Sequence, residues 1–150
     1  MDETDIKKDI YVTEIWGFKK RTKREFPLYL AKISAGFPSP ADDYIDKKLD
    51  LNESLVKHPA ATFFVKVYGS SMVNAGINSG DTLIVDRALE PADNKIVLAV
   101  LDGDFTVKRI RKLKDKLYLL PENPNCDPIE VTEEMDFEVW GVVTYVIHSV

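Results

Sequence analysis

The sequence predicts a mainly β protein, built as one compact, coiled antiparallel β domain. Three observations lead to this prediction. From Ala60 to the C-terminus, seven short segments are rich in aromatic and β-branched residues and are bounded by turn residues. One join, Asp102-Gly103, is typical of a two-residue hairpin, because both of its positions need a positive φ. The 150 residues, 45% of them hydrophobic, are enough to bury one core.

Residues 1–35 precede this β region as an extended N-terminal arm of mixed polarity without a sustained period. The arm contains eight Lys or Arg residues against six acids, a net of +2, so the rest of the chain carries −7 of a total charge of −5. The surface as a whole is therefore not a nucleic-acid footprint. The basic run KKRTKR, residues 19–24, either contacts phosphates or is solvated linker.

A boundary and a helix are expected after the arm. The glycine and prolines of AGFPSP, residues 35–40, interrupt regular structure. The next residues combine a serine cap, a proline at the first helical position and an acid three residues after the cap. With the apolar residues of YIDKKL at helical spacing, they predict a short helix over residues 40–49. Another helical turn is expected over residues 53–57.

Strands are expected at seven places from Ala60 onward. Their expected bounds are residues 62–68, 82–86, 95–101, 105–112, 116–120, 128–131 and 138–148. The segment IVLAVL is apolar without alternation, which indicates a strand covered on both faces. Seven short strands at this close spacing favour one coiled antiparallel sheet.

Few residues have the chemistry of a metal or cofactor site. The two histidines, His58 and His148, are far apart in the sequence, so neither metal-ligand spacing nor a Ser-His pair is indicated. The single cysteine, Cys126, excludes an intramolecular disulfide and is expected to be a bystander thiol. No glycine-rich loop leads from a strand into a helix, so we expect no nucleotide, metal or other cofactor.

The composition also favours a cytoplasmic protein that binds no membrane. No apolar run approaches the roughly 18 residues that a membrane span needs. The N-terminal MDETDIKKDI is too polar for a secretory signal.

One pair of residues raises the question of catalysis. In VYGSSM a glycine interrupts a strand and two hydroxyls follow, the second of which is Ser71. Ser71 is either turn filler or a nucleophile, and a serine hydroxyl becomes a nucleophile only when a neighbouring base takes its proton. Lys108 lies in FTVKRI, on the strand face that it shares with Thr106 and Ile110. Lys108 is either an ordinary edge lysine or such a base. It could act as a base if it is buried, because burial lowers the pKa of an amine.

Five segments occur in a fixed order between residues 26 and 148: AGFPSPADDYIDKKLDLN, HPAATFFVKVYGSSM, GDTLIVDRAL, DGDFTVKRI and EVWGVVTYVI. Together they resemble the LexA/UmuD family of self-cleaving serine peptidases. The resemblance is strongest to UmuD-like members, which are accessory subunits of the error-prone DNA polymerase V. It implies the C-terminal β domain of that family over residues 36–150, with residues 1–35 removed by self-cleavage.

The resemblance implies roles for individual residues. Ser71 would be the nucleophile and Lys108 the general base of a Ser-Lys dyad. The backbone N–H groups of Ser70 and Ser71 would form the oxyanion hole. The bond cut would join Ala35 to Gly36, where glycine leaves the attacked carbonyl uncrowded.

Partners and a cellular role are implied in the same way. The family forms homodimers, and its cleavage is stimulated by RecA filaments on single-stranded DNA. The shortened form would act with a UmuC-type Y-family DNA polymerase, and with replicative polymerase subunits, in translesion synthesis during SOS mutagenesis.

Two features depart from the family pattern, and three other functions are alternatives to the one it implies. The segment before FPLYLAKISAG is longer than in UmuD-like chains, and position 70 is serine where many have aspartate. A LexA-like or phage repressor would need a DNA-binding domain, for which 35 residues before the cut are too few. A non-cleaving β adaptor would bind partners and cut nothing, and the presence of Ser71, Lys108 and Ala35-Gly36 together argues against it. A signal-peptidase-like enzyme is disfavoured by the lack of a membrane anchor.

Overall fold

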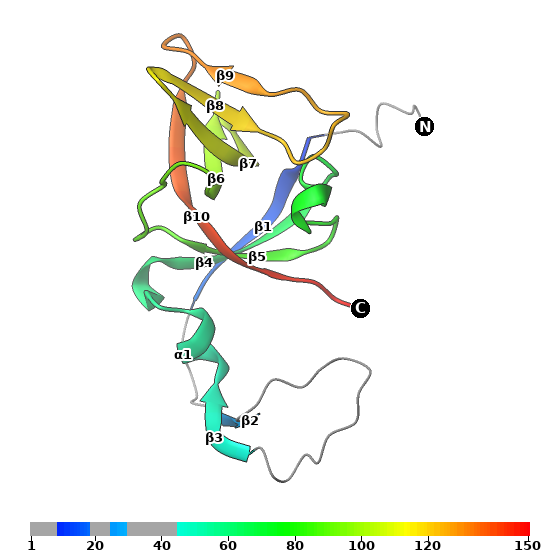
Figure 1. The fold of residues 1–150 in the computed structure, drawn as a ribbon, viewed down its shortest axis with the longest axis vertical. Helices are drawn as coiled ribbons and strands as arrows, with labels where there is room; N and C mark the ends of the chain where they lie inside the picture. The colour runs from blue at the N-terminus through cyan, green and yellow to red at the C-terminus, as the bar shows by residue number, and fades with distance from the viewer. Residues whose placement is uncertain (1–8, 19–24, 30–44) are drawn as a thin grey trace.

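One curled, eight-stranded antiparallel sheet dominates the computed structural model, which describes residues 9–18, 25–29 and 45–150. The strand order is β1-β4-β5-β10-β6-β7-β8-β9. The strands are β1 (Tyr11–Gly17), β4 (Thr62–Tyr68), β5 (Thr82–Asp86), β6 (Ile96–Leu101), β7 (Asp104–Leu113), β8 (Lys116–Leu120), β9 (Ile129–Val131) and β10 (Phe137–Ile147). A separate two-stranded sheet contains β2 (Glu25–Tyr29) and β3 (Ile45–Asp50), and Figure 1 shows it beyond α1, away from the main sheet.

The mainly β prediction is confirmed. All seven strands expected after Ala60 are present, and β4, β5 and β8 have the expected bounds. The hairpin between β6 and β7 turns at Asp102 and Gly103, whose φ angles of 49° and 90° are both positive. Tight turns of this kind keep consecutive strands adjacent.

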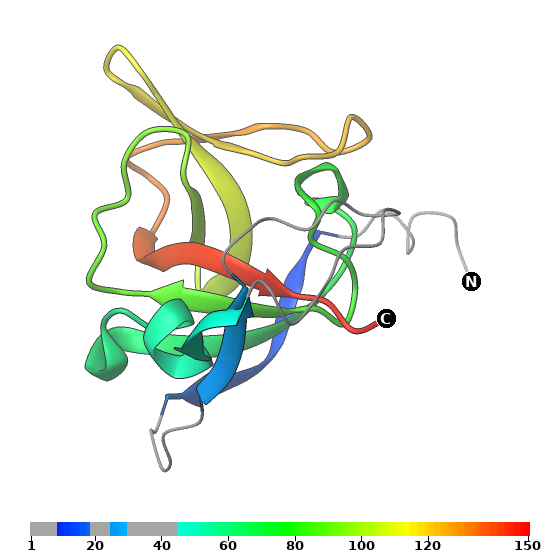
Figure 2. The ribbon, with the colours of Figure 1, turned by 60° about the horizontal axis from the view of Figure 1, so that its bottom comes forward.

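The long strand β10 joins the two ends of the curl. In Figure 1 it runs between β7, β8 and β9 at one end and β1, β4 and β5 at the other. Up to Val142 it pairs with β6, and from Val142 onward it pairs with β5, beside which it lies in Figure 2. Two register shifts along β10 mark β-bulges, which bend a strand. A Cβ at Gly141 would lie 2.5 Å from Val85 Cγ1, so glycine permits this close crossing.

Apolar side chains pack on both faces of the sheet. In β6, Leu98 points into one cluster while Val97 and Ala99 point into another, so the prediction for IVLAVL is confirmed. The larger cluster contains Ile10, Val65, Val67, Met72, Ile77, Leu83, Val85, Leu98 and Val107. The smaller cluster contains Val97, Ala99, Ile110 and Val142.

The helix expected over residues 40–49 is wrong where it can be compared. Residues 40–44 lie outside the described residues, and the chain from Ile45 to Asp50 forms β3, antiparallel to β2. Capping patterns are local, whereas a strand partner some twenty residues upstream can override them. The separate helical turn expected over residues 53–57 is present, shifted toward the N-terminus, as α1 (Leu51–Leu55), with the Asp50 carboxylate accepting from the N–H of Asn52 at 2.9 Å. No helix in the described part of the chain has the length and apolar character of a membrane span.

The described residues of the N-terminal arm form two strands that the sequence pattern did not predict, β2 and, in the main sheet, β1. β1 pairs with β4 along the edge of the main sheet. Only Val12 of this strand is half-buried and the others are exposed, which explains why no alternation is visible in the sequence. Ile10, just before β1, is 2% exposed and belongs to the larger core cluster. The arm is therefore part of the packed β domain from Ile10 to Gly17.

Candidate active site

Ser71 lies in the turn that ends β4. The strand stops at Tyr68, and Gly69 takes a φ of +116°, a conformation that side chains disfavour. Ser71 and Met72 are fully buried, and the short 3-10 helix η4 (Val73–Ala75) follows. The turn therefore presents the Ser71 hydroxyl toward the interior of the curled sheet.

Lys108 lies in the middle of β7 and is 2% exposed. Its Nζ donates to Ser71 Oγ at 3.3 Å and to Thr106 Oγ1 at 2.8 Å. It also donates to the carbonyl of Val107 at 3.3 Å and forms an ion pair with the Asp9 carboxylate. These four contacts hold the amine in a buried position.

Burial and charge act against each other at this amine. Burial lowers the pKa of Lys108 below its ordinary value of 10.5, because an ammonium loses hydration in the interior. The hydrogen bond and the negative charge of Asp9 raise the pKa, and Cys126 does so as well. Burial is the largest of these effects, so the neutral amine is more accessible here than in an exposed lysine.

The Ser71 turn is held by the chain that follows β8. Asn123 Nδ2 donates to the carbonyl of Ser70, and the N–H of Glu122 donates to the carbonyl of Ser71, each at 2.8 Å. The Glu122 carboxylate accepts in turn from Arg109 Nε at 2.5 Å. Because Arg109 adjoins Lys108 on β7, this network ties the strand that carries the amine to the turn that carries the hydroxyl.

A cleft of about 210 Å³ opens onto these groups. Ser71 and Lys108 line it from the sheet, and Cys126 and Asp127 line it from the loop between β8 and β9. The half-buried Cys126 is therefore a neighbour of the site, where the sequence indicated only a bystander.

The arm also lines this cleft. Asp9 lines the cleft, and the N–H of the next residue, Ile10, donates to Ser71 Oγ at 3.2 Å. Gly69 allows this approach, because a Cβ there would lie 2.6 Å from Ile10 Cα.

Some of the predicted site residues meet and others cannot be placed. Ser71 and Lys108, 37 residues apart in the sequence, lie within hydrogen-bonding distance, with Ser70 next to them. Ala35 and Gly36 lie outside the described residues. The catalytic roles of these residues remain predictions.

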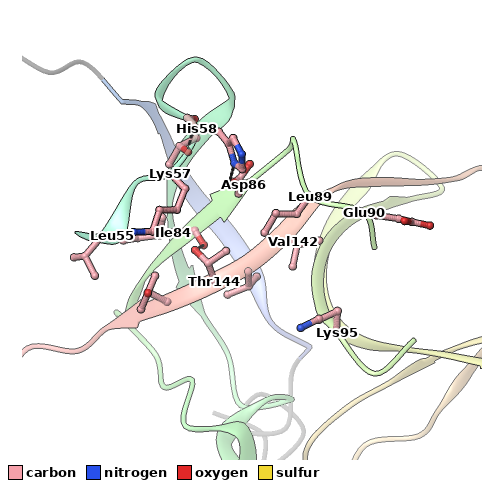
Figure 3. A pocket seen from close by; sticks show the side chains of 13 residues that line it. Leu55, Lys57, His58, Ile84, Asp86, Leu89, Glu90, Lys95, Val142 and Thr144 are labelled. Carbon is pink, nitrogen blue, oxygen red and sulfur yellow. Dashed lines mark hydrogen bonds and ion pairs between the residues drawn. The ribbon is translucent and has the colours of Figure 1, made fainter. Parts of the chain in front are cut away.

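The two histidines pair with buried aspartates elsewhere. His148 Nδ1 lies 2.5 Å from Asp81 Oδ1, and His58 Nδ1 lies 2.6 Å from Asp86 Oδ2. Figure 3 shows the His58–Asp86 pair in a larger pocket of about 460 Å³, between β5, β10 and the end of α1. Asp86 Oδ1 also accepts from the N–H of Ala88, which closes the turn after β5. Both histidines thus have structural partners.

Comparison with known families identifies the kind of protein in which this site occurs. The family model described as Peptidase S24-like matches residues 27–144. The chain belongs to this family. Membership in the S24-like family makes it a serine peptidase of the LexA/UmuD type, which confirms the resemblance read from the five segments.

Individual relatives support the assignment to the S24-like family. The chain is 48% identical over 123 residues to protein SamA of Salmonella typhimurium, covering 82% of this chain and 85% of the relative. It is 44% identical over 120 residues to protein MucA of Escherichia coli, covering 79% and 82%. It is 40% identical over 112 residues to LexA repressor 1 of Geobacter sulfurreducens, covering 74% of this chain but 55% of the repressor.

Proposed function

We propose that the chain is a self-cleaving serine peptidase that cuts its own Ala35–Gly36 bond, with Ser71 as nucleophile and Lys108 as general base. The observation that carries the proposal is the buried contact of 3.3 Å between Lys108 Nζ and Ser71 Oγ in an S24-like chain. A lysine serves as a base only when neutral, and the burial that lowers its pKa supplies that condition.

The reaction follows from these two groups. Neutral Lys108 takes the hydroxyl proton of Ser71 as Oγ adds to the carbonyl carbon of Ala35. The protonated amine then gives that proton to the nitrogen of Gly36, and the C–N bond breaks, leaving Ala35 as an ester on Ser71. A water molecule attacks this ester with Lys108 again as base, which frees the Ala35 carboxylate and restores the hydroxyl.

The hydrogen bonds from Asn123 and Glu122 to the Ser71 turn support an oxyanion hole at Ser70 and Ser71. In a trans peptide the carbonyl and the following N–H point in opposite directions. Because Asn123 holds the carbonyl of Ser70, the N–H of Ser71 faces the other way. A fixed N–H donor at a developing oxyanion is commonly worth about 3 kcal/mol.

Mass spectrometry of the purified full-length protein after prolonged alkaline incubation tests the proposal. We expect a fragment that begins at Gly36 and ends at Val150, because more Lys108 is neutral at high pH. RecA filaments on single-stranded DNA should accelerate its formation. Absence of the fragment both without and with filaments would exclude the peptidase function.

Three substitutions assign the roles. Ser71→Ala and Lys108→Arg should each abolish cleavage, since arginine keeps the charge but stays protonated. Ser70→Ala is the matched control, because alanine keeps the backbone N–H proposed for the oxyanion hole, and this chain should still cut. Cleavage by the Lys108→Arg chain would show that Lys108 is not the general base.

The shortened form is proposed to act with a UmuC-type Y-family polymerase in translesion synthesis. The cut removes the covalent link between the arm and the body, so β1 and Ile10 can dissociate and uncover the edge of β4. It also separates an arm of charge +2 from a body of charge −7, so protein surfaces rather than phosphates would carry the function. In a pull-down with such a polymerase, Gly36–Val150 should bind better than full-length Ser71→Ala. Tight binding of one operator DNA by the full-length chain would favour a repressor instead.

A further inference from the structure

The residues just before β1 occupy the cleft in which Ser71 and Lys108 meet. The Asp9 carboxylate pairs with Lys108 Nζ, and the N–H of Ile10 donates to Ser71 Oγ at 3.2 Å. Asp9 also accepts from Thr106 Oγ1 at 3.4 Å. Two consecutive residues of the arm therefore engage both groups proposed for catalysis.

The fit of this segment is a close contact between backbones. A Cβ at Gly69 would lie 2.6 Å from Ile10 Cα and 2.7 Å from the carbonyl oxygen of Asp9, so only glycine admits the segment. The side chain of Ile10 is buried in the larger core cluster with Val67 and Met72. The segment is thus anchored by an apolar side chain and aligned by β1, which pairs with β4 immediately afterwards.

The geometry of the contact with Ser71 does not allow Ser71 to cut the Asp9–Ile10 peptide bond. Attack requires Oγ to approach the carbonyl carbon from above the peptide plane, whereas a hydrogen bond from the N–H of Ile10 holds Oγ near that plane. The Asp9 carboxylate opposes the effect of burial and favours the charged form of Lys108, which cannot accept a proton. The segment therefore occupies the site without reacting.

We propose that Asp9 and Ile10 form a built-in inhibitor of the Ser71–Lys108 site, which must withdraw before the Ala35–Gly36 segment enters. This inference rests on the proposed function. Two segments of one chain cannot occupy the same cleft, so the cleavage rate scales with the fraction of molecules in which Asp9 and Ile10 have left. The Asp9 side chain is 53% exposed, so solvent competes for its carboxylate and the pair with Lys108 can open.

The rate of self-cleavage in an Asp9→Asn full-length chain tests the inhibitor. Asparagine has the shape of aspartate and keeps the Oδ1 acceptor that the N–H of Ile10 uses at 2.8 Å, but it lacks the charge that pairs with Lys108. We expect Gly36–Val150 to form roughly tenfold faster at neutral pH, as loss of a charge-assisted hydrogen bond predicts. Glu14→Gln, which removes an exposed carboxylate on β1, is the matched control and should leave the rate unchanged.

An Asp9→Asn chain that cuts at the same rate as the control, or more slowly, would overturn the inhibitor. Slower cutting would instead make Asp9 a residue that supports Lys108 in the reaction.

A second measurement separates this inference from the peptidase function. In Ser71→Ala chains, which cannot cut, the titration of Lys108 can be followed by NMR of labelled lysine side chains. The charged and titratable groups that face Lys108 are Asp9 from the arm and Cys126 and Asp127 from the loop after β8. Adding Asp9→Asn should lower the pKa of Lys108, whereas Glu14→Gln should not. If the pKa of Lys108 is unchanged, the inhibitor is overturned, whether or not chains with an intact Ser71 cleave themselves. If the pKa is lowered, the inhibitor is supported even when no chain cuts.

Discussion

At Lys108 the pH dependence of the proposed reaction is decided by two opposing effects on one amine. Burial lowers its pKa below 10.5, and the neighbouring Asp9 and Cys126 raise it. Only the neutral amine is a base, so the cleavage rate should rise about tenfold per pH unit while most Lys108 is protonated. It should level off at a pH below 10.5. Rates of fragment formation across a pH series give this profile.

A cleavage rate that does not change across the pH range in which NMR shows Lys108 to titrate would contradict a lysine base. The Ser70→Ala chain serves as the control for this profile, because it retains Asp9, Cys126 and Lys108.

The residues of the site differ in how far the sequence could predict them. Ser71 and Lys108 lie in segments of recognisable pattern, but the pattern alone left each with a structural alternative, and only the family resemblance implied that they meet. Asp9 is one acid among several in a polar segment, and nothing in its neighbourhood along the chain marks it. Its role depends on a contact with a residue 99 positions away, which only the folded sheet creates.

Among the elements, β10 depends on one glycine where it crosses β5. An added methyl at Gly141 would lie 2.5 Å from Val85 Cγ1 and 3.3 Å from the carbonyl oxygen of Asp86. Gly141→Ala should therefore lower the free energy of unfolding by about 1–3 kcal/mol, as overpacking does in other cores. Urea denaturation measures this change, with Ser149→Ala at the exposed C-terminus as the control. Equal stability of the two variants would contradict the close crossing.

The burial of each strand explains whether the sequence predicts it. The strands after Ala60 are buried on at least one face, so alternation or continuous apolar character marks them. β1 is an edge strand with mostly exposed side chains, and its backbone pairing with β4 has no counterpart in the pattern of residues. β3 was mistaken for helix because its capping signals are local while its partner β2 is distant in the chain.

For the molecule as a whole, the second half of β10 is a surface that the described fold leaves uncovered. β6 pairs with β10 only as far as Val142 in the described part of the chain, so beyond that residue β10 has one ladder, with β5. Tyr145 and Ile147 alternate onto one face there and are 44% and 46% exposed. Adjacent apolar side chains on a partly unpaired strand are typical of an interface.

We expect this surface to form the homodimer that the family resemblance implies. Ile147→Lys would place a charge in the interface, where burying it unpaired is costly, and should shift the protein toward monomer in sedimentation at micromolar concentration. Ile15→Lys is the matched control, because Ile15 is 37% exposed on β1, in the opposite edge region of the sheet, and should leave the dimer intact. The Ser71→Ala background keeps the chain uncut during the measurement. A monomeric unaltered chain would exclude the dimer, and a dimer that survives Ile147→Lys would place its interface on another face.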